Sequence, residues 1–197
     1  EAVDTVCDLI SEFQIDCELK TGNLHVASKA KEQPWLIEEA EHLQKVYDYQ
    51  QIRYVDSSEL ADMTSGQGFH GGVLDEGSRH LHPLNYALGL AKAADTLGAE
   101  LYEGSRVLSY TEGHQVCVKT DSGTVKSKYL VLACNGYLGR LEPRIAGKIM
   151  PINNFIVATE PLGAEQQQQL NPQDLCMFDA KFVVNYWKLT GDGRMLF

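Results

Sequence analysis

The sequence predicts a mixed fold that is part α/β and part α+β. Two features of the 197-residue chain carry this prediction. Helical and strand-type patterns of apolar residues follow one another through most of the chain. In addition, residues 129–133 form a continuous apolar run, Tyr-Leu-Val-Leu-Ala, which is typical of a central parallel strand buried on both faces.

The first residues have the spacing of an amphipathic helix, whose apolar stripe consists of Val3, Val6, Cys7, Ile10 and Phe13. Residues 18–27 alternate around turn residues 21–23, Thr-Gly-Asn, so we expect two strand pieces there. Pro34 favours a second helix from Gln33, because proline fits the first turn of a helix without losing a hydrogen bond. The buried face predicted for this helix consists of Leu36, Ala40, Leu43, Val46 and Tyr47.

A strand is expected at Ile52–Val55, followed by a short helix that continues through Met63. Asp56 and Glu59 have the spacing of a capping box, in which two side chains bind the free backbone N–H groups at a helix start. This pattern predicts that the helix begins directly after the strand.

Residues 66–71, Gly-Gln-Gly-Phe-His-Gly, match the dinucleotide-binding pattern G-x-G-x-x-G letter for letter. That pattern binds a dinucleotide only where a strand precedes it and a helix begins inside it. Here polar residues 62–65 precede it, and residues 72–76 have no helical pattern. We therefore interpret the segment as a flexible loop that leads into a strand.

A helix is predicted from His82 and Pro83 to a left-handed cap at Gly98. Its apolar face consists of Leu84, Ala87, Leu88, Ala91, Ala94 and Leu97. A short strand is expected at residues 99–102, and paired strands are expected at 106–110 and 115–120. The turn residues Asp-Ser-Gly at 121–123 then lead to a third strand.

The last part of the chain predicts more strands. We expect one strand at Ile152–Thr159 and a polar helix or loop at Gln166–Gln169. Residues Phe182–Lys188 and Arg194–Phe197 have the pattern of antiparallel strands around the turn at 190–193.

The composition narrows the classes of partner. The formal net charge of −10 argues against nucleic acid and anionic membranes. The five cysteines are odd in number and have no C-x-x-C spacing, so we expect reduced thiols in a cytoplasmic protein rather than a disulfide framework. His80 and His82 are two residues apart, which is the wrong spacing for one helix face, and we expect no metal site.

Several segments resemble one known family. They are His-Pro-Leu-Asn-Tyr at 82–86, Gly-Leu-Ala-Lys-Ala-Ala at 89–94, Gly-Ala at 98–99, and the apolar run and turn at 131–137. These residues resemble the D-amino-acid oxidase superfamily of FAD-dependent enzymes, and within it they are most similar to the gamma-glutamylputrescine oxidase group. The resemblance covers most of the chain and is strongest from Gly68 to Gly163.

The resemblance implies a division into domains. Residues 1–16 would be a helix of a glutathione-reductase-like FAD-binding domain, and 64–149 a further part of that domain. Residues 17–63 and 150–197 would form a mixed antiparallel-sheet substrate domain. The family's dinucleotide fingerprint would lie before residue 1, so the chain is expected to be an internal fragment that is inactive and carries no FAD alone.

The resemblance also implies cofactor-binding residues. In enzymes of this fold, the strand equivalent to residues 106–108 passes the adenine, and the backbone of Val107 would hydrogen-bond to it. The small residues of Ala133-Cys134-Asn135-Gly136 would let the backbone approach the dinucleotide. The family often has Ala-Thr-Asn here, so Cys134 is a departure. The alternative is that Val107 is an ordinary core residue and that Asn135-Gly136 is only a strand-ending turn.

For the substrate, the resemblance points to Tyr186 and Lys188 on a strand of the second domain. The family often has Tyr-Tyr-Arg there, so Trp187 and Lys188 are departures. An aromatic face attracts a cation, so Tyr186 could line an amine pocket; the alternative is an ordinary sheet aromatic. No catalytic side chain is predicted, because the flavin carries the redox chemistry in such enzymes.

The function implied is FAD-dependent oxidative deamination of a small-molecule amine, with gamma-glutamylputrescine as a candidate. Two alternatives stay open. One is an oxidase or dehydrogenase of the same superfamily that acts on glycine, sarcosine or proline, with Lys188 as the cation for the substrate carboxylate. The other is a non-catalytic domain that binds a ligand or self-associates. Uncovered apolar surface also predicts a symmetric homodimer.

Overall fold

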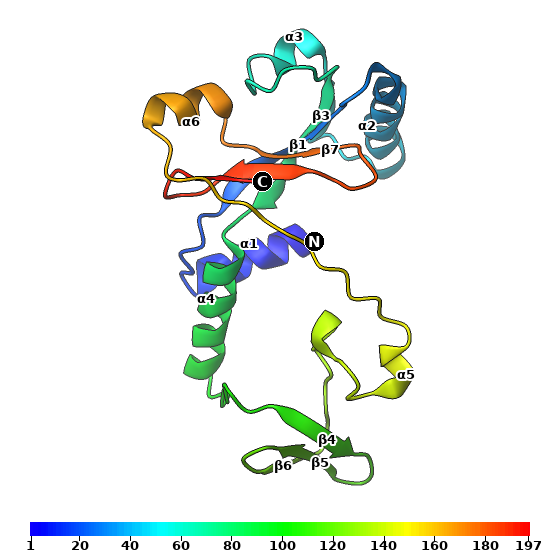
Figure 1. The fold of residues 1–197 in the computed structure, drawn as a ribbon, viewed down its shortest axis with the longest axis vertical. Coiled ribbons are helices and arrows are strands. Elements are labelled where there is room, and N and C mark those ends of the chain that lie inside the picture. Colours follow the sequence, from blue (N-terminus) through cyan, green and yellow to red (C-terminus); the bar gives the residue numbers. More distant parts are fainter. The chain divides into compact units, whose positions relative to one another are not determined.

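A computed structural model covers residues 1–197. The chain divides into two compact units, of which the first contains residues 1–97 and 156–197 and the second contains residues 98–155 (Figure 1). Both units mix helices with mainly antiparallel strands, so the mixed α/β class predicted from the sequence is confirmed at that level.

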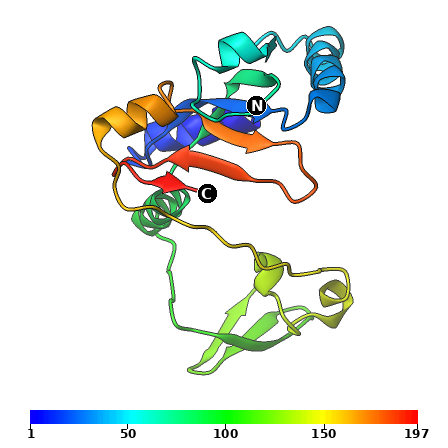
Figure 2. The same ribbon diagram turned by 45° about the horizontal axis from the view of Figure 1, so that its top comes forward.

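The first unit is built on a six-stranded sheet with the strand order β2-β3-β1-β7-β8-β9 (Figures 1 and 2). Its strands are β1 (Lys20–Val26), β2 (Ile52–Val55), β3 (Gly72–His80), β7 (Cys176–Asp179), β8 (Tyr186–Leu189) and β9 (Met195–Leu196). β1 pairs with β7 in parallel, whereas all other neighbours in the sheet are antiparallel. The expected division at residue 63 therefore separates β3 from the strands with which it pairs.

Two apolar cores lie against this sheet. The larger includes Leu24, Leu74 and Met177 together with Leu60 and Met63, which come from α3 (Ser57–Leu60) and the turn after it. The smaller lies between the sheet and α2 (Gln33–Tyr47), and consists of Ala27, Leu36, Ala40, Ile52 and Val73. Neighbouring residues Val73 and Leu74 belong to different cores, because successive side chains of a strand point to opposite faces.

Three more helices complete the first unit. They are α1 (Ala2–Glu12), α4 (Pro83–Thr96) and α6 (Ala164–Leu170). The predicted caps of α4 are confirmed, since His82 Nδ1 accepts the Asn85 N–H at 3.2 Å and Gly98 has a φ of +91°. Figure 1 shows α3 and α6 above the sheet, and α1 and α4 below it.

Several predictions for the first unit were wrong in part. Residues 20–26 form one strand with a bulge between Thr21 and Asn23, not two strands joined by a turn. In α2, the side chains of Val46 and Tyr47 are exposed. Residues 152–159 form only an isolated bridge through Ala158, because their partner β9 is just two residues long.

The capping prediction for α3 was half right. Asp56 accepts hydrogen bonds from the backbone N–H groups of Ser58 and Glu59, as a helix cap does. Glu59 does not complete the capping box, because its carboxylate forms an ion pair with Arg53 at 2.6 Å. The helix also ends before Met63. The loop at residues 66–71 leads into β3, as predicted.

The second unit contains a three-stranded antiparallel sheet of β4 (Val107–Thr111), β5 (Val116–Thr120) and β6 (Thr124–Ser127). All three strands were predicted. A short 3₁₀ helix, η2 (Asn135–Tyr137), and a short α-helix, α5 (Pro143–Ala146), follow them.

Two strands predicted for the second unit are absent. Residues 99–102 are irregular, and the apolar run 129–133 is irregular and exposed, with Tyr129 at 85% and Val131 at 83% exposure. A central parallel strand needs a pairing partner on each side. No strand of the structure pairs with residues 129–133, because β4, β5 and β6 pair only with one another.

None of the helices combines the length and the apolar character that crossing a membrane requires.

The larger core predicts which leucines stabilise the first unit. Leu24 on β1 is 0% exposed, whereas Leu84 on α4 is 61% exposed. We expect Leu24→Ala to lower the free energy of unfolding by about 2–5 kcal/mol, because it removes buried methyl groups and leaves a cavity. Leu84→Ala, the matched control, should change it by less than about 0.5 kcal/mol. Urea unfolding measures both values, and similar values for the two variants would contradict this placement of the core.

Candidate functional site

Val107 and Cys134, two of the residues predicted to bind the cofactor, line the same hollow of the second unit. It has a volume of about 430 Å³ and is lined by Arg106, Val107, Leu108, Cys134, Tyr137, Leu138, Gly139, Arg140 and Leu141. The structure thus brings the start of β4 beside the segment that follows the apolar run. Ala133, Asn135 and Gly136 belong to the adjoining turn but do not line the hollow.

The backbone beside this hollow is open to a ligand. A Cβ atom added at Gly136 would meet no atom within 4 Å. Asn135 and Gly139 have φ angles of +48° and +58°, so the chain turns sharply on both sides of η2. Glycine permits such turns and close approach because it has no side chain.

The residues that line the hollow fit FAD by their chemistry. FAD combines flat ring systems with an anionic pyrophosphate. Val107 and Leu108 offer apolar surface for a ring, and Arg106 and Arg140 offer guanidinium groups that can bind phosphate oxygens.

A buried carboxylate lies behind the same segment. Glu142 is 5% exposed and accepts hydrogen bonds from the Arg144 backbone N–H at 2.9 Å, from Arg144 Nε at 2.8 Å, and from the Tyr110 hydroxyl. Hydrogen bonds from Arg144 and then from Tyr110 lower the pKa of Glu142 to about 2. Arg144 also pairs with Glu112 at 2.7 Å. The sequence reading missed this group, because no spacing motif links Tyr110 to Glu142.

The two residues predicted to contact substrate share one face of β8. Tyr186 and Lys188 are two residues apart, so their side chains point to the same side of the sheet. Tyr186 is 38% exposed. Trp187 points to the opposite face, where its ring stacks on that of Phe69 with centroids 5.7 Å apart.

Lys188 has a structural contact that the sequence did not predict. Its Nζ atom donates a hydrogen bond to the carbonyl oxygen of Leu81 at 2.9 Å, in the connection between β3 and α4. Burial lowers the pKa of Lys188, and the Cys176 thiol lies close by. The ammonium group therefore ties β8 to the start of α4.

His80 lies in the same cluster. Its Nε2 atom is 3.0 Å from the carbonyl oxygen of Asp174, so Nε2 must carry the proton, while buried Nδ1 has no hydrogen-bond partner. Lys20 pairs with the carboxylate of Asp174 at 2.5 Å. Burial, and then the charge of Lys188, lower the pKa of His80. The sequence analysis considered His80 only in order to exclude a metal site, and did not predict this cluster.

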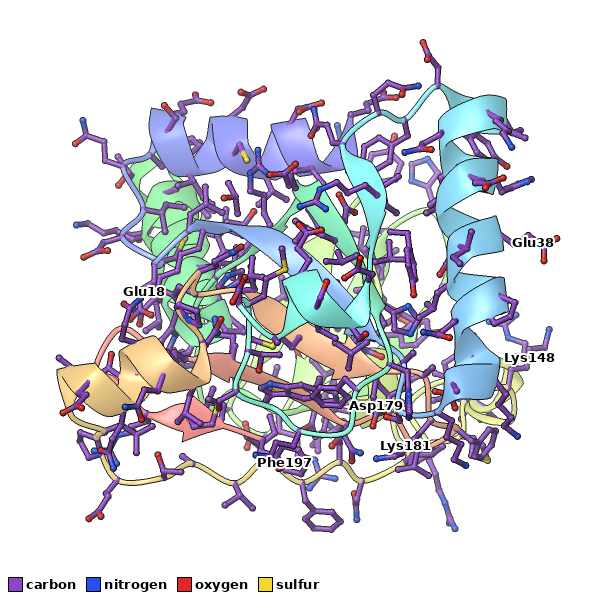
Figure 3. All side chains as sticks on the ribbon, turned by 90° about the horizontal axis from the view of Figure 1, so that it is seen from above. Glu18, Glu38, Lys148, Asp179, Lys181 and Phe197 are labelled. Atoms are coloured by element: carbon purple, nitrogen blue, oxygen red, sulfur yellow. The ribbon has the colours of Figure 1, made fainter.

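A second carboxylate lies at the end of β7. Asp179 is buried and accepts hydrogen bonds from the Asn185 backbone N–H at 3.0 Å and side-chain N–H at 2.8 Å, and it pairs with Lys181 at 2.9 Å. Burial alone would raise the pKa of Asp179, but the hydrogen bonds from Lys181 and Asn185 lower it to about 2. Asp179, Lys181 and Phe197, which Figure 3 labels, line a hollow of about 320 Å³. The carboxylate is fully bonded within the protein.

The structure has no group of three His, Cys, Asp or Glu side chains that could hold a metal ion. The five cysteines are unpaired.

Comparisons with known proteins agree on one family. The model of the family "FAD dependent oxidoreductase" matches residues 1–197. Among curated proteins, the chain is 35% identical over 193 residues to "Probable oxidoreductase OrdL" of Rhizobium meliloti (strain 1021). This match covers 98% of the chain and 45% of that protein. The chain is also 32% identical over 198 residues to gamma-glutamylputrescine oxidoreductase of Escherichia coli (strain K12). This match covers 100% of the chain and 46% of that protein.

Solved structures share the fold. The match with glycine oxidase from Geobacillus kaustophilus covers 98% of the chain and 51% of that enzyme's chain, with a TM-score of 0.76 and 18% identity. The match with L-proline dehydrogenase from P. horikoshii covers 98% of the chain and 53% of that enzyme's chain, with a TM-score of 0.75 and 18% identity. The chain spans about half the length of the curated relatives that it matches.

The His80 cluster predicts that stability falls in mild acid. Unfolded histidine has a pKa of about 6.5, and the pKa of His80 is lower in the folded protein. Neutral His80 therefore stabilises the fold above about pH 6.5, and this contribution is lost as the pH falls from about 6.5 through the folded pKa. Between pH 7.5 and pH 5.5, we expect the urea concentration at the midpoint of unfolding to fall less in His80→Gln than in the wild type. The glutamine keeps a hydrogen-bond donor to the carbonyl oxygen of Asp174 but does not titrate.

His42→Gln, at an exposed position on α2, is the matched control and should keep the wild-type pH dependence. An equal drop in the wild type and in His80→Gln would show that His80 does not govern acid stability.

Proposed function

Because the chain belongs to the family of FAD-dependent oxidoreductases, we propose that the whole protein oxidises an amine, with gamma-glutamylated diamines as the favoured substrate class. The observation that carries the proposal is the hollow in the second unit, which both Val107 and Cys134 line, beside an open backbone turn and two guanidinium groups. The 32% identity to gamma-glutamylputrescine oxidoreductase over the whole chain supports this substrate class.

The residues of this chain would hold FAD in the second unit. The Val107 backbone N–H would bind adenine, and the turn Ala133-Cys134-Asn135-Gly136 would let the dinucleotide approach the backbone. When bound, FAD supplies the redox chemistry, since it accepts the hydride from the carbon that bears the amine nitrogen.

The sheet of the first unit would contribute to substrate binding through Tyr186. Its partly exposed aromatic face can attract a protonated amine. Lys188 is half-buried and bonded to the carbonyl oxygen of Leu81. An amino-acid substrate would need a free cation for the carboxylate next to its oxidised carbon. The bond of Lys188 to Leu81 therefore favours an amine whose carboxylate, like that of a gamma-glutamyl group, lies far from the oxidised carbon.

Variants of Val107 test the cofactor contact. If its backbone N–H binds adenine, Val107→Ala in the full-length protein should lower FAD affinity only slightly, whereas Val107→Pro should lower it at least tenfold, because proline lacks the donor. Flavin absorbance after gel filtration measures the bound fraction. Val125→Pro, on the edge strand β6 of the same sheet, is the control for strand disruption. Equal flavin content in Val107→Pro and Val107→Ala would count against the contact.

A panel of amines tests the substrate class. We expect kcat/KM of the full-length protein for gamma-glutamylputrescine to exceed the values for glycine, sarcosine and proline by at least tenfold, or about 1.4 kcal/mol. Tyr186→Leu should lower kcat/KM about two- to tenfold through loss of a cation–π contact, while Tyr186→Phe should retain most of it. Preference for an amino acid would overturn the proposed substrate class.

A further inference from the structure

Glu142 links two segments of the second unit that share no backbone hydrogen bonds with each other. The segment of residues 134–149 makes backbone hydrogen bonds only within itself. The strands β4, β5 and β6 likewise pair only with one another. Side chains alone join the two parts by hydrogen bonds: Tyr110 of β4 to Glu142, and Glu112 to Arg144.

These bonds have the features of a rigid connection. The Glu142 carboxylate is almost fully buried, and Arg144 holds it through its backbone N–H, Nε and a terminal nitrogen at 2.9, 2.8 and 3.0 Å. The Tyr110 hydroxyl donates to the second carboxylate oxygen. Hydrogen bonds to an ionised group are stronger than neutral ones, and a buried group that is fully bonded has little freedom to move.

The two parts joined by these bonds also form the two walls of the hollow that contains Val107 and Cys134. Val107 lies on β4, three residues before Tyr110, and Cys134 and Leu138 lie on the segment of residues 134–149, which contains Glu142. A change in the Tyr110–Glu142 bond would therefore change the width of the hollow.

We infer that Glu142 is a positioning residue, which together with Tyr110 and Arg144 sets the spacing between β4 and the turn at residues 134–136 for the dinucleotide. We name these three residues the Glu142 clamp. The inference rests on the proposed function, because it assigns the hollow to FAD. The clamp does not touch the reacting atoms, and acts only through the shape of the hollow.

The test uses the full-length protein and three variants. Tyr110→Phe removes the hydroxyl donor, and Glu142→Gln removes the charge while keeping the shape. Tyr102→Phe is the matched control, because the Tyr102 hydroxyl also donates to a carboxylate, that of Glu100 at 2.7 Å, but within one exposed loop. FAD affinity is measured by the change in flavin fluorescence on binding, and the visible circular dichroism of bound FAD is recorded at saturation.

We expect Tyr110→Phe and Glu142→Gln each to weaken FAD binding about tenfold and to change the dichroism of bound FAD, while Tyr102→Phe does neither. The double variant should lose less than the sum of the two single losses, because Tyr110→Phe removes and Glu142→Gln weakens the same hydrogen bond. Equal affinity and equal dichroism in Tyr110→Phe and Tyr102→Phe would overturn the inference.

A second readout needs no flavin, and so separates this inference from the proposed function. Trypsin can cut after Arg140, which is exposed on the segment that the clamp holds. Cleavage of the apoprotein there should be several-fold faster in Tyr110→Phe than in Tyr102→Phe. A wild-type protein that binds no FAD would refute the proposed function and the role of the clamp in cofactor binding. Equal cleavage in the two variants would refute the clamp itself.

Discussion

The parallel pairing of β1 with β7 is the constraint on which the first unit depends. It joins Asn23–Val26 to Cys176–Asp179, which lie near opposite ends of the chain. Leu24 and Met177 meet in this pair and are fully buried in the larger core. β8 and β9 reach the sheet only through β7, so the position of Tyr186 follows from this one ladder. Without it, the N-terminal strands would form a three-stranded sheet with one edge of β1 unpaired.

Local chemistry explains which elements could be predicted from the sequence. The ends of α4 follow from His82, Pro83 and Gly98, and the strands β4, β5 and β6 follow from alternating residues around turns. Predictions that required a distant partner were wrong. The run 129–133 has a strand composition but no neighbour with which to pair, and β7 was missed because Cys-Met-Phe-Asp has no alternating pattern.

The same distinction applies to the candidate site. Val107 and Cys134 came from the family resemblance, and the structure places both at one hollow, although their contact with a cofactor stays a prediction. The hydrogen bonds of Glu142 with Tyr110 and of Lys188 with Leu81 could not be predicted from the sequence. In each pair the two residues are remote in sequence, and only folding brings them together. The positive charge of Lys188 suggested a contact with a substrate, whereas in the structure its Nζ atom donates a hydrogen bond to the backbone carbonyl oxygen of Leu81.

The β1–β7 ladder also determines when the protein can fold during its synthesis. Ser28, next to β1, and Asp179, at the end of β7, are 151 residues apart and are joined by a hydrogen bond. At ~5–20 residues per second, a ribosome needs roughly 8–30 seconds to make the chain between them. Throughout that interval the apolar edge of β1 has no partner, and such an edge pairs readily with other chains. The nascent protein is therefore expected to depend on chaperones that bind exposed strands until β7 leaves the ribosome.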